Sequence, residues 1–461
     1  MSFINTSRIT LLVAGLTCAV LTRAAGEIAD ANWPQWRGPL GTGVAPKGNP
    51  PVSWSETENV KWRVKIPGGG HATPVVWGDR LFVLTAIPTG KKVEAPADAP
   101  PPPPPPPPGE GGPGRQGGRR GMGGPKPTEV HQFAILCLDR NTGTVLWQQT
   151  AREEVPHEGF RQGEGSLASG SPLTDGERVY AFFGSRGLYC YDLDGKARWN
   201  QDLGDMRVAM GFGEGSSPAL YQDTLVVSWD HEGDSFIVAL DKQTGTTRWK
   251  KTREERTSWS TPLVVAQGGK PQVIVTATGK IRGYDLATGD VVWECGGLTP
   301  NVIPSPVAAE GVVYAMSGFR GNSLLAIRLG RTGDLTGSDA ILWSHKKSTP
   351  YVPSPLLYGD KLYFLANNNG MLSVFDARTG TALIDAERLE AIPGVYASPV
   401  GASGRVYLVG RNGATLVIKQ AEKLEVLATN RLYEKFDASP AIAGKDLFLR
   451  GREYLYCLAE K

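Results

Sequence analysis

The feature that most constrains the fold is a Ser/Thr-Pro dipeptide that recurs along the chain. From the second copy onward its prolines are 46, 44, 44, 49, 44 and 41 residues apart, and the first interval of 98 contains an insertion. Repeats of this length are typical of propellers and solenoids, because one unit cannot bury its faces alone. The copies are Thr73-Pro74, Ser171-Pro172, Ser217-Pro218, Thr261-Pro262, Ser305-Pro306, Ser354-Pro355, Ser398-Pro399 and Ser439-Pro440.

All units but the last contain four short β-rich runs separated by turns. In residues 171–199, for example, the runs Val179–Phe183 and Leu188–Tyr191 are separated by a Gly-containing turn. The second half of most units repeats Asp, Thr-Gly and then Trp, in which the Gly permits a left-handed turn and the Trp is large enough to fix an outer strand. We therefore predict an all-β fold, an eight-bladed β-propeller of four-stranded antiparallel blades.

The two ends of the chain predict how the propeller closes. The eighth unit stops at Lys461 before any outer strand with a Trp. An isolated alternating segment, Val60–Val64, carries Trp62 near the other end of the chain. We expect this N-terminal strand to complete the last blade, which would leave no unpaired sheet edge.

The N-terminal residues indicate export. Arg8 precedes the apolar run Ile9–Leu21, which is too short to span a bilayer and is typical of a secretory signal cleaved after Ala24 or Ala31. Lipidation at Cys18 is a less favoured alternative, because Leu is missing three residues before it. We predict a signal peptide at 1–31 and a periplasmic or secreted protein with no transmembrane segment.

The remaining domain boundaries follow from composition. We assign 32–57 to an extended N-terminal segment, 58–461 to the propeller, and 86–131 to a disordered Pro/Gly-rich insertion within the first blade, which contains Pro100–Pro108. The insertion could also act as a tether or bind a Pro-recognising partner. The formal net charge of +3 gives no field that favours nucleic acid, and we expect a monomer.

In an up-and-down blade, the blade-to-blade connections and the turns between the second and third strands emerge on one face, which we call the top. Side chains there would surround the channel with an aromatic, polar and basic rim that suits an anionic small molecule or an extended peptide. A rim that is merely polar is the structural alternative. The candidates for any ligand are His71, Arg186, Glu214, Trp259, Lys280, Asn301, Arg320, Tyr351, Tyr396, Arg411 and Asp437.

No motif predicts catalysis or a metal centre. Asp230–Asp234 carries three carboxylates, but it matches no EF-hand and is interpreted as a solvated acidic turn. The five histidines show no metal-ligand spacing, and nucleophile-elbow, P-loop and dinucleotide motifs are absent from the sequence. Cys137, Cys190 and Cys457 occupy one small position of the repeat, so we expect buried thiols and no disulfide.

The pattern Ser-Pro, Gly-Asp, then Ala-x-Asp-x-x-Thr-Gly-x-x-x-Trp resembles the repeats of pyrroloquinoline-quinone (PQQ)-like propellers from about Trp54 to Lys461. The opening Trp33–Pro39 looks like that of exported PQQ-like proteins of planctomycetes. The resemblance implies one of two classes. Quinoprotein alcohol and sugar dehydrogenases hold PQQ and calcium in the top funnel, whereas the outer-membrane assembly factor BamB is non-catalytic and binds proteins.

The adjacent Cys-Cys pair of methanol-type dehydrogenases is missing, and their catalytic Asp and calcium ligands have no match. We therefore expect no cofactor and a protein-binding scaffold for envelope proteins, with outer-membrane protein assembly as its most concrete role. The alternative is a PQQ-dependent dehydrogenase, with PQQ and calcium in the funnel. A third hypothesis is a carbohydrate-binding module that uses Trp259, Tyr351 and Tyr396.

Overall fold

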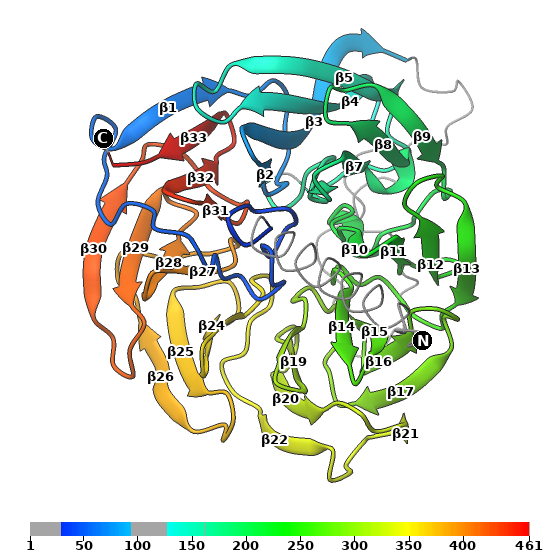
Figure 1. The fold of residues 1–461 in the computed structure, drawn as a ribbon, viewed down its shortest axis with the longest axis vertical. Helices are drawn as coiled ribbons and strands as arrows, with labels where there is room; N and C mark the ends of the chain where they lie inside the picture. Colours follow the sequence, from blue (N-terminus) through cyan, green and yellow to red (C-terminus); the bar gives the residue numbers. More distant parts are fainter. Residues whose placement is uncertain (1–28, 94–126, 162, 461) are drawn as a thin grey trace, which may run out of the picture.

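The computed structural model describes residues 29–93, 127–161 and 163–460. These residues form strands β1 to β33 and two 3-10 turns, η1 (Gly184–Arg186) and η2 (Ala209–Gly211). The strands make eight sheets around a central channel (Figure 1). The predicted all-β, eight-bladed propeller is confirmed.

The blades follow one another in chain order, with the first strand of each innermost. Blade 1 consists of β2 (Val75–Trp77), β3 (Arg80–Lys92), β4 (Glu129–Asp139) and β5 (Val145–Glu154), and blade 2 of β6 (Leu173–Thr174), β7 (Arg178–Phe182), β8 (Leu188–Asp192) and β9 (Ala197–Gln201). Blade 3 consists of β10 (Ala219–Tyr221), β11 (Thr224–Trp229), β12 (Phe236–Asp241) and β13 (Thr247–Thr252), and blade 4 of β14 (Leu263–Gln267), β15 (Lys270–Thr276), β16 (Lys280–Asp285) and β17 (Val291–Gly296). Blade 5 consists of β18 (Val307–Ala309), β19 (Val312–Ser317), β20 (Ser323–Arg328) and β22 (Ile341–His345), and blade 6 of β23 (Leu356–Tyr358), β24 (Lys361–Leu365), β25 (Met371–Asp376) and β26 (Ala382–Arg388). Blade 7 consists of β27 (Val400–Ala402), β28 (Arg405–Val409), β29 (Ala414–Lys419) and β30 (Val426–Arg431), and blade 8 of β31 (Ala441–Ala443), β32 (Asp446–Arg450), β33 (Tyr454–Leu458) and β1 (Val60–Lys65). A short strand, β21 (Gly333–Asp334), adds to the edge of blade 4 in parallel with β17.

The last blade is closed by the N-terminal strand, as predicted. Strand β1 pairs antiparallel with β33 in a register that places Arg63 opposite Tyr456. The indole N–H of Trp62 donates to the carbonyl of Arg140 in blade 1, at 2.9 Å. Strand β1 and the last strand of the chain, β33, therefore lie in the same blade.

The recurring dipeptide forms a hydrogen-bonded ring around the channel. The backbone N–H of each Ser or Thr donates to the side-chain hydroxyl of its counterpart in the next blade, through seven bonds of 2.8–3.0 Å from Thr73 to Ser439. The Thr73 hydroxyl donates to the Ser439 carbonyl and joins the ends of the ring. The dipeptide recurs because each copy bonds both of its neighbours.

The repeated Thr-Gly and Trp also connect neighbouring blades. In five blades the indole N–H of the outer-strand Trp donates to a backbone carbonyl in the turn of the next blade that begins with Asp and contains Gly, at 2.8–3.0 Å. Gly245 shows why Gly is needed there, since its φ is +74° and a Cβ atom would lie 2.6 Å from the ring of Trp199. Blade 5 lacks this turn, and Trp293 of blade 4 instead donates to Gln272, at 2.9 Å.

The N-terminal segment 32–57 closes the channel on the face opposite the blade-to-blade connections. Trp33 forms a bridge with Val76 of blade 1, and Val44 forms one with Gly401 of blade 7. Arg37 is buried and donates to the carbonyls of Pro355 and Pro399, at 2.9 and 3.0 Å. This segment, dark blue in Figure 1, crosses the centre of the ring.

Both ends of the predicted insertion belong to strands of the first blade. Strand β3 continues to Lys92 and β4 begins at Glu129, with Ile87 opposite Gln132 in the ladder. The remainder, 94–126 with Pro100–Pro108, lies outside the described residues, as do residues 1–28 of the predicted signal peptide. No described helix is both long and apolar enough to cross a bilayer.

The cysteines of the described chain are packing residues. Cys137, Cys190, Cys295 and Cys457 are all buried and free. Burial raises the pKa of the Cys137 and Cys190 thiols to about 12, so these groups stay protonated at neutral pH. The predicted buried thiols are confirmed.

Candidate functional site

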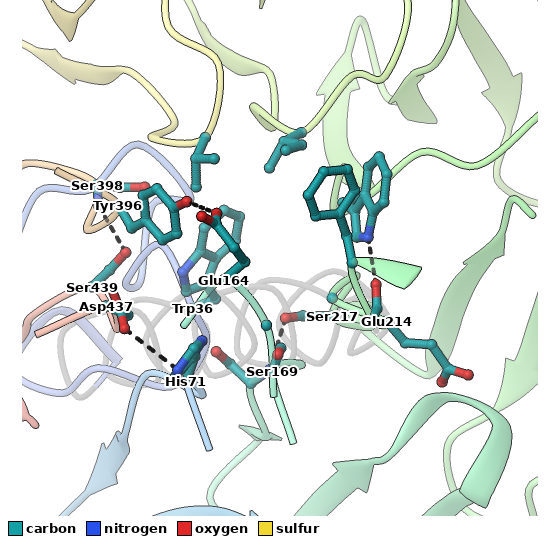
Figure 2. A pocket seen from close by; sticks show the side chains of 18 of the residues that line it. Trp36, His71, Glu164, Ser169, Glu214, Ser217, Tyr396, Ser398, Asp437 and Ser439 are labelled. Atoms are coloured by element: carbon teal, nitrogen blue, oxygen red, sulfur yellow. Dashed lines mark hydrogen bonds and ion pairs between the residues drawn. The ribbon is translucent and has the colours of Figure 1, made fainter. Parts of the chain in front are cut away.

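A cavity of about 170 Å³ lies at the top end of the channel, above the Ser/Thr ring (Figure 2). It combines aromatic rings with a smaller number of polar groups, the usual composition of a ligand pocket. Its aromatic residues are Trp36, Phe212, Trp259, Tyr351 and Tyr396, and its polar side chains include His71, Glu164, Ser169, Glu214 and Asp437. Ser171, Ser217, Ser398 and Ser439 of the ring lie below them.

The structure brings together six of the residues predicted from the sequence, namely His71, Glu214, Trp259, Tyr351, Tyr396 and Asp437. Two more lie directly behind this lining. Arg411 packs on the ring of Tyr396, with its guanidinium carbon 3.8 Å from the ring centroid, and Asn301 interacts with Tyr351. Arg186, Lys280 and Arg320 lie elsewhere on the top face.

Asp437 is the centre of the charged side of the cavity. Its buried carboxylate accepts hydrogen bonds from Arg411, at 2.6 Å, and from Arg452, at 3.0 Å. His71 Nε2 lies 3.5 Å from the same carboxylate. Burial lowers the pKa of His71 to about 4 although Asp437 opposes the shift, so the imidazole is neutral at pH 7.

The connection between blades 1 and 2 covers part of the cavity. Glu164 on this connection accepts a hydrogen bond from the hydroxyl of Tyr396, on the far side of the mouth (Figure 2). The neighbouring carbonyl of Gly163 accepts bonds from Arg411 and Arg452. Both contacts fix a segment of blade 1 against blades 7 and 8.

Sequence reasoning missed Glu164 and Trp36. A signal for Glu164 was present, because the connection from Trp147 to Ser171 is the longest between any two blades. Trp36 reaches the cavity from the N-terminal segment below, and the repeat pattern gives no indication of that path. The cavity is thus formed by repeated and unrepeated parts of the chain together.

The part of Glu214 nearest its backbone lines the cavity, while its carboxyl group points away from the cavity (Figure 2). That carboxyl group accepts hydrogen bonds from the backbone N–H and the hydroxyl of Ser185. Burial raises its pKa, although both bonds from Ser185 oppose the shift. Glu214 therefore anchors the loop of blade 2 and is turned away from any ligand.

The other predicted rim cations are largely engaged in ion pairs. Arg186 is buried and bonds Glu154, Asp205 and Nδ1 of His157. Lys280 pairs with Glu294 on the neighbouring strand, at 2.8 Å. These two predicted residues thus have structural partners and do not line the cavity.

In the acidic stretch Asp230–Asp234, Glu232 and Asp234 are exposed as the sequence indicated, but Asp230 is not. Asp230 is buried and binds Arg253 through both carboxylate oxygens, at 2.7 and 2.9 Å. Its second oxygen also accepts the hydroxyl of Ser258, at 2.7 Å. The prediction failed because the partners of Asp230 come from the chain more than twenty residues later, and they neutralise the carboxylate inside the protein.

The residues present do not fit PQQ with calcium. Calcium takes about six to eight oxygen ligands, several of them carboxylates. The three carboxylates at the cavity, Glu164, Glu214 and Asp437, are bound to a tyrosine, a serine and two arginines. No cluster of three potential metal ligands occurs among the described residues. Arg411 and Arg452, which could bind a quinone carboxylate, are held by Asp437.

A family model described as outer membrane protein assembly factor BamB matches residues 132–383 and 233–461. No curated protein matches the chain in sequence. Among solved structures, BamB from Moraxella catarrhalis is 16% identical, with a TM-score of 0.50 over 70% of this chain and 91% of that one. A europium-containing methanol dehydrogenase is 10% identical, with a TM-score of 0.61 over 93% and 98%. A quinohemoprotein alcohol dehydrogenase from Pseudomonas putida is 10% identical, with a TM-score of 0.54 over 95% and 81%. At these identities the likenesses establish the fold alone.

Proposed function

Because the chain belongs to the family of the outer membrane protein assembly factor BamB, we propose that it is a non-catalytic propeller that binds other proteins. The observation that carries this proposal is that every carboxylate at the cavity is already bound by another side chain. A general base works best with a pKa near the working pH, whereas the pKa of His71 is lowered to about 4. His71 is thus poorly suited to act as a general base at neutral pH.

The cell envelope is the proposed location, and outer-membrane protein assembly is the most specific role. The predicted signal peptide and the description of the family support this assignment. We further propose that the chain acts as a monomer, because the eight blades close on themselves and the outer strand of blade 8 is supplied by the chain's own β1.

The main test is a titration of the purified protein with PQQ and calcium, followed by an assay for dye-linked alcohol oxidation. We expect no saturable binding and no dye reduction. The variant Trp259→Ala serves as the control for the site, since Trp259 lines the cavity. Saturable binding that this substitution abolishes, together with alcohol oxidation, would refute the proposal in favour of a quinoprotein dehydrogenase.

A second experiment addresses partners. Chemical crosslinking in envelope fractions followed by affinity purification should recover outer-membrane or secreted proteins. Recovery of none in repeated experiments would contradict the scaffold function.

Carbohydrate binding remains a second candidate because of one observation. The predicted aromatic residues Trp259, Tyr351 and Tyr396 line a single cavity with Trp36. Aromatic faces offer large, rigid contact area. A glycan array with the wild type and Trp259→Ala tests this candidate, and loss of a specific signal in the variant would support it.

A further inference from the structure

Three cationic side chains on the top of blade 5 form no ion pair with a carboxylate of the described residues. Arg320 lies in the loop between β19 and β20, and Lys346 and Lys347 directly follow β22. All three side chains belong to exposed residues, and none forms an ion pair with any part of the chain that the structure describes. Their charges are therefore available to a partner.

These cations are held close together by hydrogen bonds between the two segments that carry them. Thr349, two residues after Lys347, donates its hydroxyl to the carbonyl of Ser317, at 2.6 Å. Its backbone N–H donates to Asn322 Oδ1, at 3.0 Å, and its hydroxyl accepts the N–H of Ser323, at 3.2 Å. The segment of Lys346 and Lys347 is thus fixed against the loop of Arg320.

An aromatic pair lies beside the cations. The rings of Phe319 and Tyr351 are stacked, with centroids 5.1 Å apart and planes at 27°. The guanidinium carbon of Arg320 lies 5.2 Å from the centroid of Phe319. Arginine and aromatic residues are enriched in the centres of protein interfaces. Tyr351 also lines the cavity, so this surface is continuous with the mouth of the channel.

The backbone of this surface is strained. Arg320 has φ of 52° and Ser348 has φ of 51°, in the left-handed region that glycine adopts without penalty. Such conformations are retained where the surrounding structure imposes them and are often found at functional sites. A long cationic side chain therefore occupies position 320, although glycine would adopt this backbone conformation without strain.

We propose that the basic patch formed by Phe319, Arg320, Lys346, Lys347 and Tyr351 binds an Asp- and Glu-rich segment of a protein partner. Carboxylates of the segment would pair with the three cations, and an apolar side chain would lie on Phe319 and Tyr351. Charge complementarity selects this occupant, because unpaired cations speed association with an acidic surface and disfavour a basic one. The inference rests on the proposed binding function and specifies the chemistry of the partner.

The test measures binding of a fluorescent Asp/Glu-rich peptide with one Phe, against a Lys-rich peptide of the same length. We expect the acidic peptide alone to bind, and more weakly as the salt concentration rises. The variant Arg320→Glu/Lys346→Glu/Lys347→Glu should weaken binding by about tenfold or more. The matched control, Lys270→Glu/Lys423→Glu/Lys445→Glu, changes the net charge equally at exposed positions away from the patch and should bind like the wild type.

A further variant separates the aromatic contribution, since Phe319→Ala should weaken the acidic peptide but leave the salt dependence in place. Equal binding by the patch variant and the control variant would overturn the inference, as would equal binding of both peptides. Binding of anionic phospholipid vesicles in place of the peptide, lost in the patch variant, would also overturn it and assign a membrane surface. Recovery of the same envelope partners by the patch variant would refute the patch while leaving the scaffold function intact.

Discussion

Blades 3 and 4 use their top-face arginines differently from blade 5. Arg253 is buried and bound by both oxygens of Asp230, and Arg282 pairs with Glu255. On blade 5, Arg320 is exposed, its guanidinium lies over the ring of Phe319, and it forms no ion pair with the described residues. The difference shows that a basic residue in a propeller loop is a binding candidate only after its partners are known, because most rim arginines here hold the blades together.

The largest expected effect comes from breaking a buried pair. Asp230→Asn would leave Arg253 charged and uncompensated in the interior, and should lower the free energy of unfolding by about 3–5 kcal/mol. Denaturant unfolding measures this value. The control is Asp339→Asn, at an exposed pair with Arg331, which should change it by less than about 1 kcal/mol. Equal losses in the two variants would show that burial does not distinguish the pairs.

The next largest effect is a pH dependence of stability that arises at His71, beside Asp437. Burial lowers the pKa of His71 from 6.5 to about 4, so between these values the unfolded chain binds a proton that the folded protein excludes. Stability should therefore fall by about 3 kcal/mol as the pH drops from about 6.5 to about 4. In thermal unfolding across this pH range, the melting temperature of His71→Gln should fall less steeply with decreasing pH than that of the wild type. His131→Gln controls for the loss of one histidine, and identical slopes in the two variants would contradict the assignment.

A smaller effect contrasts two left-handed residues of the top face. Gly413 of blade 7 has φ of +86°, and a Cβ atom there would lie 2.1 Å from the carbonyl of Leu432, so Gly413→Ala should lower the free energy of unfolding by about 2 kcal/mol or more. Arg320→Gly should instead raise it by up to about 1 kcal/mol, because strain is relieved. The same variant should bind the acidic peptide more weakly. A loss of stability at Arg320 would mean that its side chain is structural.

The smallest effect concerns the lysines of the patch. Lys346→Gln/Lys347→Gln should change the free energy of unfolding by less than about 0.5 kcal/mol, since neither side chain has an ionic partner in the described chain. Peptide binding should still weaken. A clear loss of stability would remove the contrast with blades 3 and 4.

The architecture was predictable because the residues that repeat are the ones that connect the blades. Each Ser or Thr of the dipeptide bonds its counterpart, and Trp62 marked the closing strand because the same contact is made by Trp199 and others. The positions around the channel followed from that geometry, and six predicted residues meet at one cavity.

The role of individual charged residues was not predictable. Whether Arg186 or Arg320 is free depends on carboxylates such as Glu154, which come from other parts of the chain and follow no repeat. The burial of Asp230 was missed for the same reason, because its partner Arg253 directly follows β13, two strands later in the chain, and no local pattern marks the pair. Repeats specify packing, whereas the pairing of charges is set by the segments that differ between copies.

The most direct test of the account is site-specific photo-crosslinking in envelope fractions, with the photoreactive residue placed at Lys347 of the patch or, as a control, at Lys270, which is also exposed. The account predicts adducts from position 347 alone, with the crosslinked peptide mapping to an Asp/Glu-rich segment of an envelope protein. Adducts from both positions in equal yield, or adducts at 347 that map to segments without acidic residues, would contradict it.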